Sequence, residues 1–396
     1  MGSSCSCSRD HSRVLSSVTP RHKCQLADQL RHCSSLTDTH SSMCVRMQIR
    51  PQDRCQCIAT IPSAPAAPEE QRPSPARTQT LDEELPSPFV RDYAAVSTQN
   101  RQFRKHMEDE CVAILKFRAF PDDPAVSSFF GVYDGHGGDF CAKYAAKHFH
   151  WKLVELMQVK HDTKKGRYQS LEGKSNRNRS DETTSSCSDK SSDVSIDVLS
   201  NAEIESCYVE AFAAIDKELQ DFDESSDSGS TAVTCLIRRC NGRTMFYIAN
   251  VGDSRAIFCC DGQTSRLSVD HTATNQDEVE RIRALNGIIV NKRVAGSISV
   301  TRALGQADEK KFITSAPHIM SLEIATDDAI LMLVSDGVTD VFRDEELTEF
   351  VAKHLAEGEK SVTIGNKLLD EAKAQGSTDN MTAVIICFGE TRSSSI

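Results

Sequence analysis

Residues 129–138 read FFGVYDGHGG, and they decide the fold. The apolar run from Phe129 to Tyr133 predicts a buried strand, since a short apolar segment bounded by glycine is typical of one. Asp134 stands where this strand ends, and the glycines that follow allow the backbone to turn sharply. The stretch therefore predicts a carboxylate at the end of a sheet strand.

The same design recurs along the chain, with an aspartate where a strand meets a turn. It is found in IANVGDSR at 248–255, in ILMLVSDGVTD at 330–340 and in GSTDN at 376–380, and the acidic motif RKHMED lies at 104–109. Carboxylates at strand ends can converge on one cleft, where two of them about 4 Å apart repel by roughly 4 kcal/mol at an effective dielectric of about 20. Such a cluster needs cations or protons, and oxygen-only ligands favour Mg²⁺ or Mn²⁺.

Each motif taken alone has an ordinary structural interpretation. A single Asp-Gly pair is usually a turn, Asp253 fits a turn or a local cap, and Asp379 fits an Asx turn. Glu108 and Asp109 fit a solvated face, and a lone His136 is more often structural than catalytic. The joint appearance of these motifs, in this order, is what favours a functional site.

The rest of the pattern predicts an α+β fold. Strands are expected at 111–117, 128–133, 231–238, 244–250, 254–260, 328–335 and 382–388. Helices, in which apolar residues recur every three or four positions, are expected at 139–157, 201–219, 276–285, 345–355 and 361–374. Hairpin-like strands that cluster between helices indicate α+β layers.

Composition divides the 396 residues into folded and unfolded parts. Residues 1–90, rich in Ser, Arg, His and Pro, are predicted to be a disordered N-terminal segment, and 160–200 a polar surface insertion. Residues 91–390 are predicted to form the folded domain, and 391–396 a tail. The net charge of −11 argues against nucleic acid as a partner. The lack of a secretory signal or a long apolar run favours a cytoplasmic protein with reduced thiols, and we expect a monomer.

Taken in order, the motifs resemble those of the metal-dependent, type-2C protein phosphatase family (PPM). The pieces that carry the resemblance are residues 104–109, 132–138, 229–232, 249–255, 270–271, 299–305, 335–340 and 379–380. They cover roughly residues 90–390 apart from the insertion. The resemblance implies a layered α-β-β-α sandwich, in which two antiparallel sheets are flanked by helices and metal ions lie at one end.

The resemblance also implies a set of metal-site residues, namely Asp134, Gly135, Asp336, Asp379, Glu108, Asp253 and Asp340. Asp134 is expected to bridge two Mg²⁺ or Mn²⁺ ions, with the Gly135 carbonyl on the second ion and Asp336 and Asp379 on the first. Glu108 acts with Asp109 to hold metal-bound waters. The positions of Asp253 and Asp340 are those that shape the rim and hold a third, weaker ion.

Three further roles follow from the same resemblance. Arg104 is expected to bind the substrate phosphate, because its planar donors suit that geometry. His136 is expected to be the general acid that protonates the leaving alkoxide, and Asp109 to assist through water. Two positions depart from the family pattern, since Thr339 stands where many relatives have an aromatic residue and Gln306 where they have an aspartate.

The implied reaction is hydrolysis of phosphoserine and phosphothreonine in phosphorylated proteins. A hydroxide that bridges the two ions attacks directly, so that no phospho-enzyme nucleophile is needed. This agrees with the sequence, in which no cysteine is followed by an arginine at the Cys-x₅-Arg spacing in a Gly-rich setting. An alternative stays open, in which the chain is a pseudophosphatase that acts as a binding module or a membrane-tethered scaffold. The acidic residue at every main ligand position weighs against it.

The first residues, MGSSCS, fit the pattern for myristoylation of Gly2, with Cys5 and Cys7 as candidate palmitoylation sites. One myristoyl chain binds membranes only marginally, so the cysteines would supply the second anchor. We expect wild-type protein in the membrane fraction and the Gly2→Ala variant in the soluble fraction on cell fractionation. A soluble wild-type protein with an unmodified N-terminus in mass spectra would exclude this anchor. The match to so short a pattern would then be due to chance.

Overall fold

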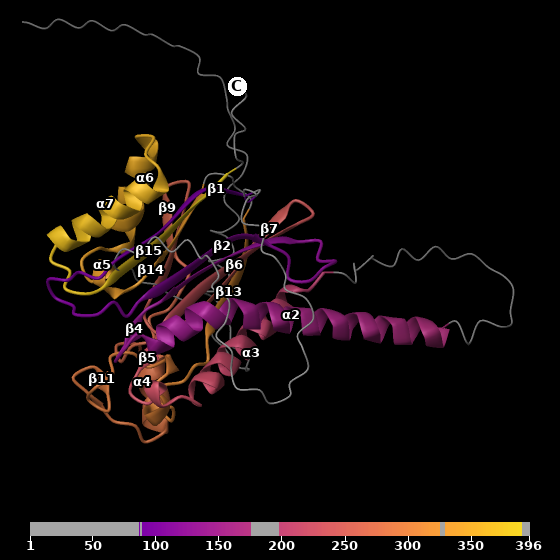
Figure 1. The fold of residues 1–396 in the computed structure, drawn as a ribbon, viewed down its shortest axis with the longest axis horizontal. Coiled ribbons are helices and arrows are strands. Elements are labelled where there is room, and N and C mark those ends of the chain that lie inside the picture. Colours follow the sequence, from indigo (N-terminus) through magenta and orange to yellow (C-terminus); the bar gives the residue numbers. More distant parts are fainter. Residues whose placement is uncertain (1–86, 88, 176–197, 325–328, 390–396) are drawn as a thin grey trace, which may run out of the picture.

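In this computed structural model the chain is described over residues 87, 89–175, 198–324 and 329–389. Two five-stranded antiparallel sheets stand at its centre (Figure 1). The first sheet has the order β1 (Val90–Thr98), β15 (Met381–Phe388), β14 (Ala329–Val334), β8 (Arg255–Cys260) and β9 (Gln263–Arg266). The second has the order β13 (His318–Ile324), β7 (Arg243–Val251), β6 (Ala232–Cys240), β3 (Val126–Tyr133) and β2 (Glu110–Phe117).

The main hydrophobic core lies where these sheets meet. Every residue of β15 is buried, and β3 is buried from Ser127 to Tyr133. A continuous apolar run is the pattern of a strand in a sandwich core, since both of its faces are covered. β14 and β15 pack against β3, so that the two sheets share one core.

Helices cover both outer faces of the sandwich (Figure 1). On the second sheet lie α2 (Phe140–Ser175), which packs against β3, and α3 (Asn201–Leu219), which packs against β7 and β13. On the first sheet lie α6 (Asp344–Ala356), which contacts β8 and β9, and α7 (Ser361–Ala374), which contacts β1 and β15. This order of layers confirms the predicted α-β-β-α sandwich.

The start of α3 illustrates how the sequence sets an element. The hydroxyl of Ser200 accepts the N–H of Glu203, and the Glu203 carboxylate accepts the N–H of Ser200, which completes a capping box. From Ile204 to Leu219 the buried residues recur every three or four positions, so one stripe of the helix faces the sheet.

Two of the longer strands, β1 and β13, were not among those predicted, and each lies at the edge of a sheet. β1 pairs only with β15, and β13 only with β7, among the strands described. Their burial alternates irregularly, because an edge strand is partly covered and carries mixed side chains. Among the described residues, the first strand is β1, which begins at Val90.

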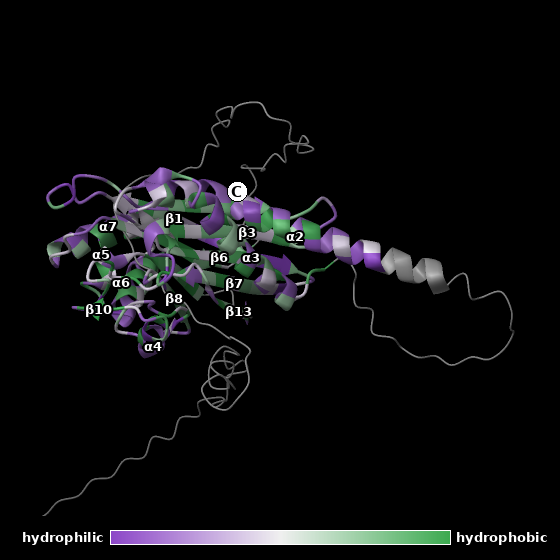
Figure 2. Ribbon diagram, turned by 90° about the horizontal axis from the view of Figure 1, so that it is seen from below, coloured by the Kyte–Doolittle hydropathy of each residue, from purple (hydrophilic) through white to green (hydrophobic). Residues whose placement is uncertain are grey.

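Helix α2 was predicted to end at residue 157, but it continues to Ser175 and passes beyond the sheets (Figure 1, Figure 2). The first part of the predicted polar insertion is therefore helical. Lys and Gln are good helix formers, and Gln158 donates to Asp162 one turn later. Lys164, eleven residues before the end of α2, also donates to the carbonyl of Val198 at 2.9 Å and to Glu203 at 3.1 Å, which ties this part of the helix to the start of α3. The periodic pattern of apolar residues stops near residue 157, before the helix itself ends, because the outer part of α2 covers no sheet.

A smaller lobe lies beside one end of the sandwich. It contains α4 (Gln276–Ala284) and the hairpin of β10 (Ile289–Val290) and β11 (Arg293–Val294), around a separate core of Ile282, Val294, Ile298, Val300, Ala303 and Ile313. A three-stranded sheet joins it to the sandwich, in the order β12 (Leu304–Gly305), β5 (Gly229–Ser230) and β4 (Gly135–His136). The lobe therefore lies next to the turn that follows Asp134.

The N-terminal anchor proposed from Gly2, Cys5 and Cys7 falls outside the described residues, as do 176–197 of the insertion. Within the part of the chain that the structure describes, no helix has the length and apolar character needed to span a bilayer.

Candidate metal centre

The predicted aspartates all lie at one end of the sandwich. Asp109 immediately precedes β2, and Asp134 follows β3; since Glu110 pairs with Tyr133, the two aspartates share an end. Asp336 is the first residue of α5 (Asp336–Thr339), directly after β14, and Val334 pairs with Arg255, two residues beyond Asp253. Asp379 precedes β15, which pairs with β14 at the same end. The antiparallel register therefore gathers residues that are up to 270 positions apart in the chain, counting from Asp109 to Asp379.

The carboxylates of this cluster act on one another electrostatically. Burial raises the pKa of Asp134 well above its usual range, and the carboxylates of Asp109, Asp336, Asp379 and Asp253 raise it further. The negative charge of each neighbour raises the free energy of the ionised form of Asp134. A cluster of this kind requires cations or protons if it is to stay folded at neutral pH.

Two other members of the cluster show the same effect. Burial, followed by the charge of Asp336, raises the pKa of Asp379 to about 7. Burial also raises the pKa of Asp109 well above its usual range, although the hydroxyl of Ser335 donates to this carboxylate at 2.9 Å and favours its ionised form. Three carboxylates with raised pKa values at one end of the sheets mark a functional-site candidate.

Backbone geometry around Gly135 fixes the turn after Asp134. The N–H of Gly135 donates to the carbonyl of Glu108 at 3.1 Å, and the N–H of Thr231 donates to the carbonyl of Asp134 at 2.9 Å. A Cβ added to Gly135 would lie 2.2 Å from the Glu108 carbonyl oxygen. Only glycine fits here, because two backbone segments approach too closely for any side chain.

Asn380 joins the first acidic motif to the last, a role that the sequence analysis did not assign. Its Oδ1 accepts the N–H of Glu108 at 2.9 Å, and its Nδ2 donates to the carbonyls of His106 and Gln99 at 2.9 and 3.0 Å. An amide beside Asp379, directly before a strand, was the signal available in the sequence. Its contacts with the front motif depend on the tertiary fold and leave no local pattern.

Three predicted residues lie at the margin of the cluster. The exposed guanidinium of Arg104 forms an ion pair with Asp379. Burial raises the pKa of Glu108, while Arg104 lowers it and Asp139 raises it. Asp340 is exposed at the C-terminal cap of α5, where its N–H donates to the Asp336 carbonyl at 2.9 Å.

His136 lies on β4, two residues after Asp134. Its Nε2 is 2.9 Å from Oε1 of Gln306, and burial lowers the pKa of the ring. At the other departure from the family pattern, the Oγ1 atom of Thr339 is buried with no hydrogen-bond partner among the described residues. The structure thus places Gln306 beside the predicted general acid, and Thr339 immediately before Asp340 at the end of α5.

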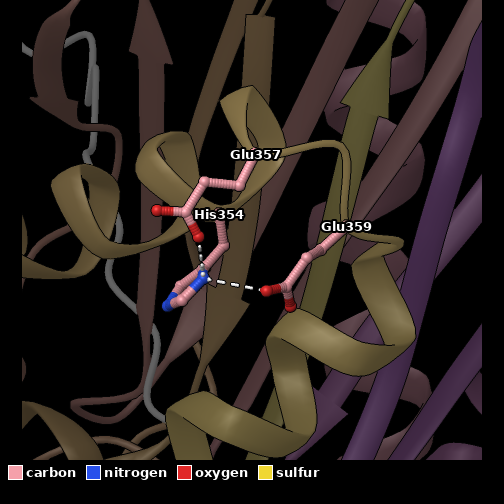
Figure 3. Close-up of side chains that lie close together, drawn as sticks. All are labelled: His354, Glu357 and Glu359. Atoms are coloured by element: carbon pink, nitrogen blue, oxygen red, sulfur yellow. Dashed lines mark hydrogen bonds and ion pairs between the residues drawn. The ribbon is translucent and has the colours of Figure 1, made fainter.

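A second group of metal-binding side chains lies away from the aspartates, at the end of α6 (Figure 3). Nδ1 of His354 is 3.1 Å from Glu357 and 3.3 Å from Glu359, and Lys367 also pairs with Glu359. Among described residues this is the group whose ligand atoms all lie within 4.8 Å of one another. The side chains of this group already pair with one another and with Lys367, so we assign no metal ion to the group.

Comparison with known proteins agrees with this geometry. A family model described as "Protein phosphatase 2C" matches residues 93–381. "Protein phosphatase 1B" of Rattus norvegicus is 30% identical over 299 residues, which cover 72% of this chain and 68% of the rat protein. "Probable protein phosphatase 2C 21" of Oryza sativa subsp. japonica is 30% identical over 341 residues, which cover 82% of this chain and 89% of the rice protein.

The fold is shared with a solved structure of low sequence identity. The crystal structure of a phosphatase from a pathogenic strain of Toxoplasma gondii superposes with a TM-score of 0.56 at 18% identity, covering 77% of this chain and 96% of that one. The family model spans the described domain from β1 to β15, and two relatives at 30% identity are named protein phosphatases. The chain therefore belongs to the protein phosphatase 2C family of metal-dependent protein serine/threonine phosphatases.

Proposed function

We propose that this chain hydrolyses phosphoserine and phosphothreonine at the aspartate cluster around Asp134, with two Mg²⁺ or Mn²⁺ ions held there. The observation that carries the proposal is the burial of Asp134 among Asp109, Asp336, Asp379 and Asp253, each of which raises its pKa. Carboxylates packed in this way are costly unless a cation neutralises them.

The donor set fits divalent ions of this kind. The carboxylates and the Gly135 carbonyl are hard oxygen donors, which Mg²⁺ and Mn²⁺ prefer over softer ligands. Asp134, Gly135, Asp336 and Asp379 would hold the two ions, Glu108 and Asp109 would bind through water, and Asp253 with Asp340 would serve a third, weaker site. The exposed position of Asp340 agrees with the weaker role.

Two divalent ions, when bound, lower the pKa of a water and neutralise the phosphoryl oxygens. The chain itself supplies orientation and a proton. Arg104 lies at the exposed margin beside Asp379 and presents a guanidinium to an incoming phosphate, once the ions have taken over the carboxylate charge. His136 lies next to the cluster and can deliver a proton to the oxygen that leaves phosphorus.

The proposal is tested by measuring phosphate release from a phosphothreonine peptide by the purified full-length protein with Mn²⁺. Turnover that survives repurification and is absent from an Asp134→Asn preparation made in parallel would support it. The pseudophosphatase alternative predicts peptide binding without release. No observation in the structure favours that alternative, because every main ligand position carries a carboxylate.

The His136→Ala variant should lose more activity on a phosphothreonine peptide than on p-nitrophenyl phosphate. An alkoxide leaving group needs a proton, whereas p-nitrophenolate leaves with little assistance, and general acid catalysis is worth about 10²–10⁴-fold. We expect kcat on the peptide to fall by about 10²-fold and kcat on the aryl phosphate by less than about tenfold. Equal losses on the two substrates would contradict the assignment of His136 as the general acid.

A further inference from the structure

In the hydrogen bond between Gln306 and His136, only the histidine ring can be the donor. Nε2 of His136 lies 2.9 Å from Oε1 of Gln306, and Gln306 is 5% exposed. The amide nitrogen of the same side chain faces the carbonyl oxygen of Asp227 at 3.5 Å. A carbonyl oxygen accepts hydrogen bonds and cannot donate, so this neighbour turns the amide with its Oε1 toward the ring. The ring atom that meets Oε1 must then be the donor, Nε2–H.

The backbone around Gln306 is held from several sides. Its φ of 56° and ψ of 51° are left-handed, a conformation that costs free energy for a residue with a side chain. Its N–H donates to the carbonyl of Ser228 at 2.7 Å, and the N–H of Gly305 donates to Asp216 at 3.0 Å. Lys310 pairs with the same Asp216 at 2.6 Å. These contacts keep Gln306 in an unfavourable backbone conformation that directs its side chain toward His136.

Gly229 leaves the space in which the two side chains meet. It lies on β5 between β4 and β12, where it pairs with His136 on one side and with Gly305 on the other. A Cβ added to Gly229 would lie 2.5 Å from Nε2 of His136 and 3.2 Å from Oε1 of Gln306. Any side chain at position 229 would therefore push the ring and the amide apart.

We infer that Gln306 is a positioning residue that holds His136 as the Nε2–H tautomer and leaves Nδ1 as the nitrogen that delivers the proton. The inference rests on the proposed function, in which His136 protonates the leaving group. In that step the bond between phosphorus and the serine or threonine oxygen breaks and its electron pair stays on that oxygen. For this step the ring carries a proton on both nitrogens; the Nδ1 proton passes to this oxygen, and the ring is left neutral with Nε2–H still donated to Gln306.

The kinetic test compares Gln306→Met, which keeps the length of the side chain and removes the acceptor, with Gln306→Glu, which keeps an acceptor. Gln306→Met should lower kcat on a phosphothreonine peptide about tenfold and kcat on p-nitrophenyl phosphate less than about twofold, with KM unchanged, because only the alkoxide needs the proton. Gln306→Glu should restore most of the peptide activity. A loss that is equal on the two substrates would overturn the inference.

Two further variants separate positioning from a general loss of structure. In a His136→Ala background, Gln306→Met should cause no further loss, because it acts through the ring that is missing. Arg281→Met is a control in the adjoining lobe: it removes the contacts with Glu278 and the Thr301 carbonyl and should lower both activities in the same proportion. An additive loss in the His136→Ala background would overturn the inference.

The tautomer itself can be read without activity, by long-range ¹H–¹⁵N spectra of protein labelled at histidine, with the His136 signals identified by their absence from His136→Ala. Wild-type protein should show the neutral ring as Nε2–H, and Gln306→Met should show a mixture of tautomers. A wild-type ring in the Nδ1–H form would overturn the inference even if turnover is normal. A wild-type protein without turnover but with the expected tautomer change would support the positioning contact and overturn the proposed function.

Discussion

Asp134→Asn is expected to lower kcat on a phosphothreonine peptide about 10³-fold, the loss that corresponds to about 4 kcal/mol of transition-state stabilisation. Burial and four other aspartates act together on this carboxylate, and it is the one that we propose to share its charge between two cations. Asparagine keeps the shape of the side chain and removes the charge. Initial rates at saturating Mn²⁺ would measure the effect.

The same substitution should raise the Tm of the metal-free protein. Removing one charge from a group of mutually repelling carboxylates relieves a cost of roughly a few kcal/mol at the effective dielectric of a protein. Asp370→Asn, on the exposed face of α7, provides a matched control. It should change neither kcat on the peptide nor the Tm of the metal-free protein, since that carboxylate is 61% exposed. If Asp134→Asn destabilised the metal-free protein and kept its turnover, Asp134 would be a structural residue and the metal centre would have to lie elsewhere.

The position of Asp134 could be predicted from the sequence because its signal is local. An apolar run followed by Asp-Gly places a carboxylate at a strand end regardless of what lies around it. The convergence of Asp134 with Asp253, Asp336 and Asp379 could not be derived in that way. It depends on which strands pair and in which register, and pairings such as Glu110 with Tyr133 or Val334 with Arg255 leave no mark on either segment alone.

The longer elements that sequence patterns missed are covered on one side only or not at all. The edge strands β1 and β13 each bury one side incompletely, so their side chains do not alternate cleanly. The outer part of α2 covers no sheet, so it lacks an apolar stripe even though its residues favour a helix. Contacts such as Asn380 with Glu108, or Gln306 with His136, join segments 272 and 170 residues apart and are set by the tertiary fold alone.

Removal of divalent ions should abolish turnover, and the stabilisation that the ions provide should depend on pH. Burial and Asp336 raise the folded-state pKa of Asp379 from its usual 3.8 to about 7. Without metal, the folded protein therefore keeps a proton on Asp379 that the unfolded chain gives up above about pH 4. This carboxyl favours folding below pH 4, and its contribution is lost as the pH rises through about 7. Tm measured in EDTA should fall between pH 5 and 7.5 by more in wild-type protein than in Asp379→Asn.

A bound cation takes the place of that proton, so the gain in Tm on adding millimolar Mn²⁺ or Mg²⁺ should be larger at pH 7.5 than at pH 5. Turnover lost in EDTA should return when Mn²⁺ or Mg²⁺ is added. Adding Ca²⁺ tests how strictly the cluster selects the smaller ions, because Ca²⁺ accepts a looser shell of oxygen ligands. Asp379→Asn controls for the titration of all other groups, because it removes one carboxyl and leaves the rest in place. Full activity in EDTA, or a gain in Tm that is the same at both pH values, would contradict a centre in which divalent ions replace protons on crowded carboxylates. The two measurements are independent, since the first follows catalysis and the second follows the charge balance of the folded state.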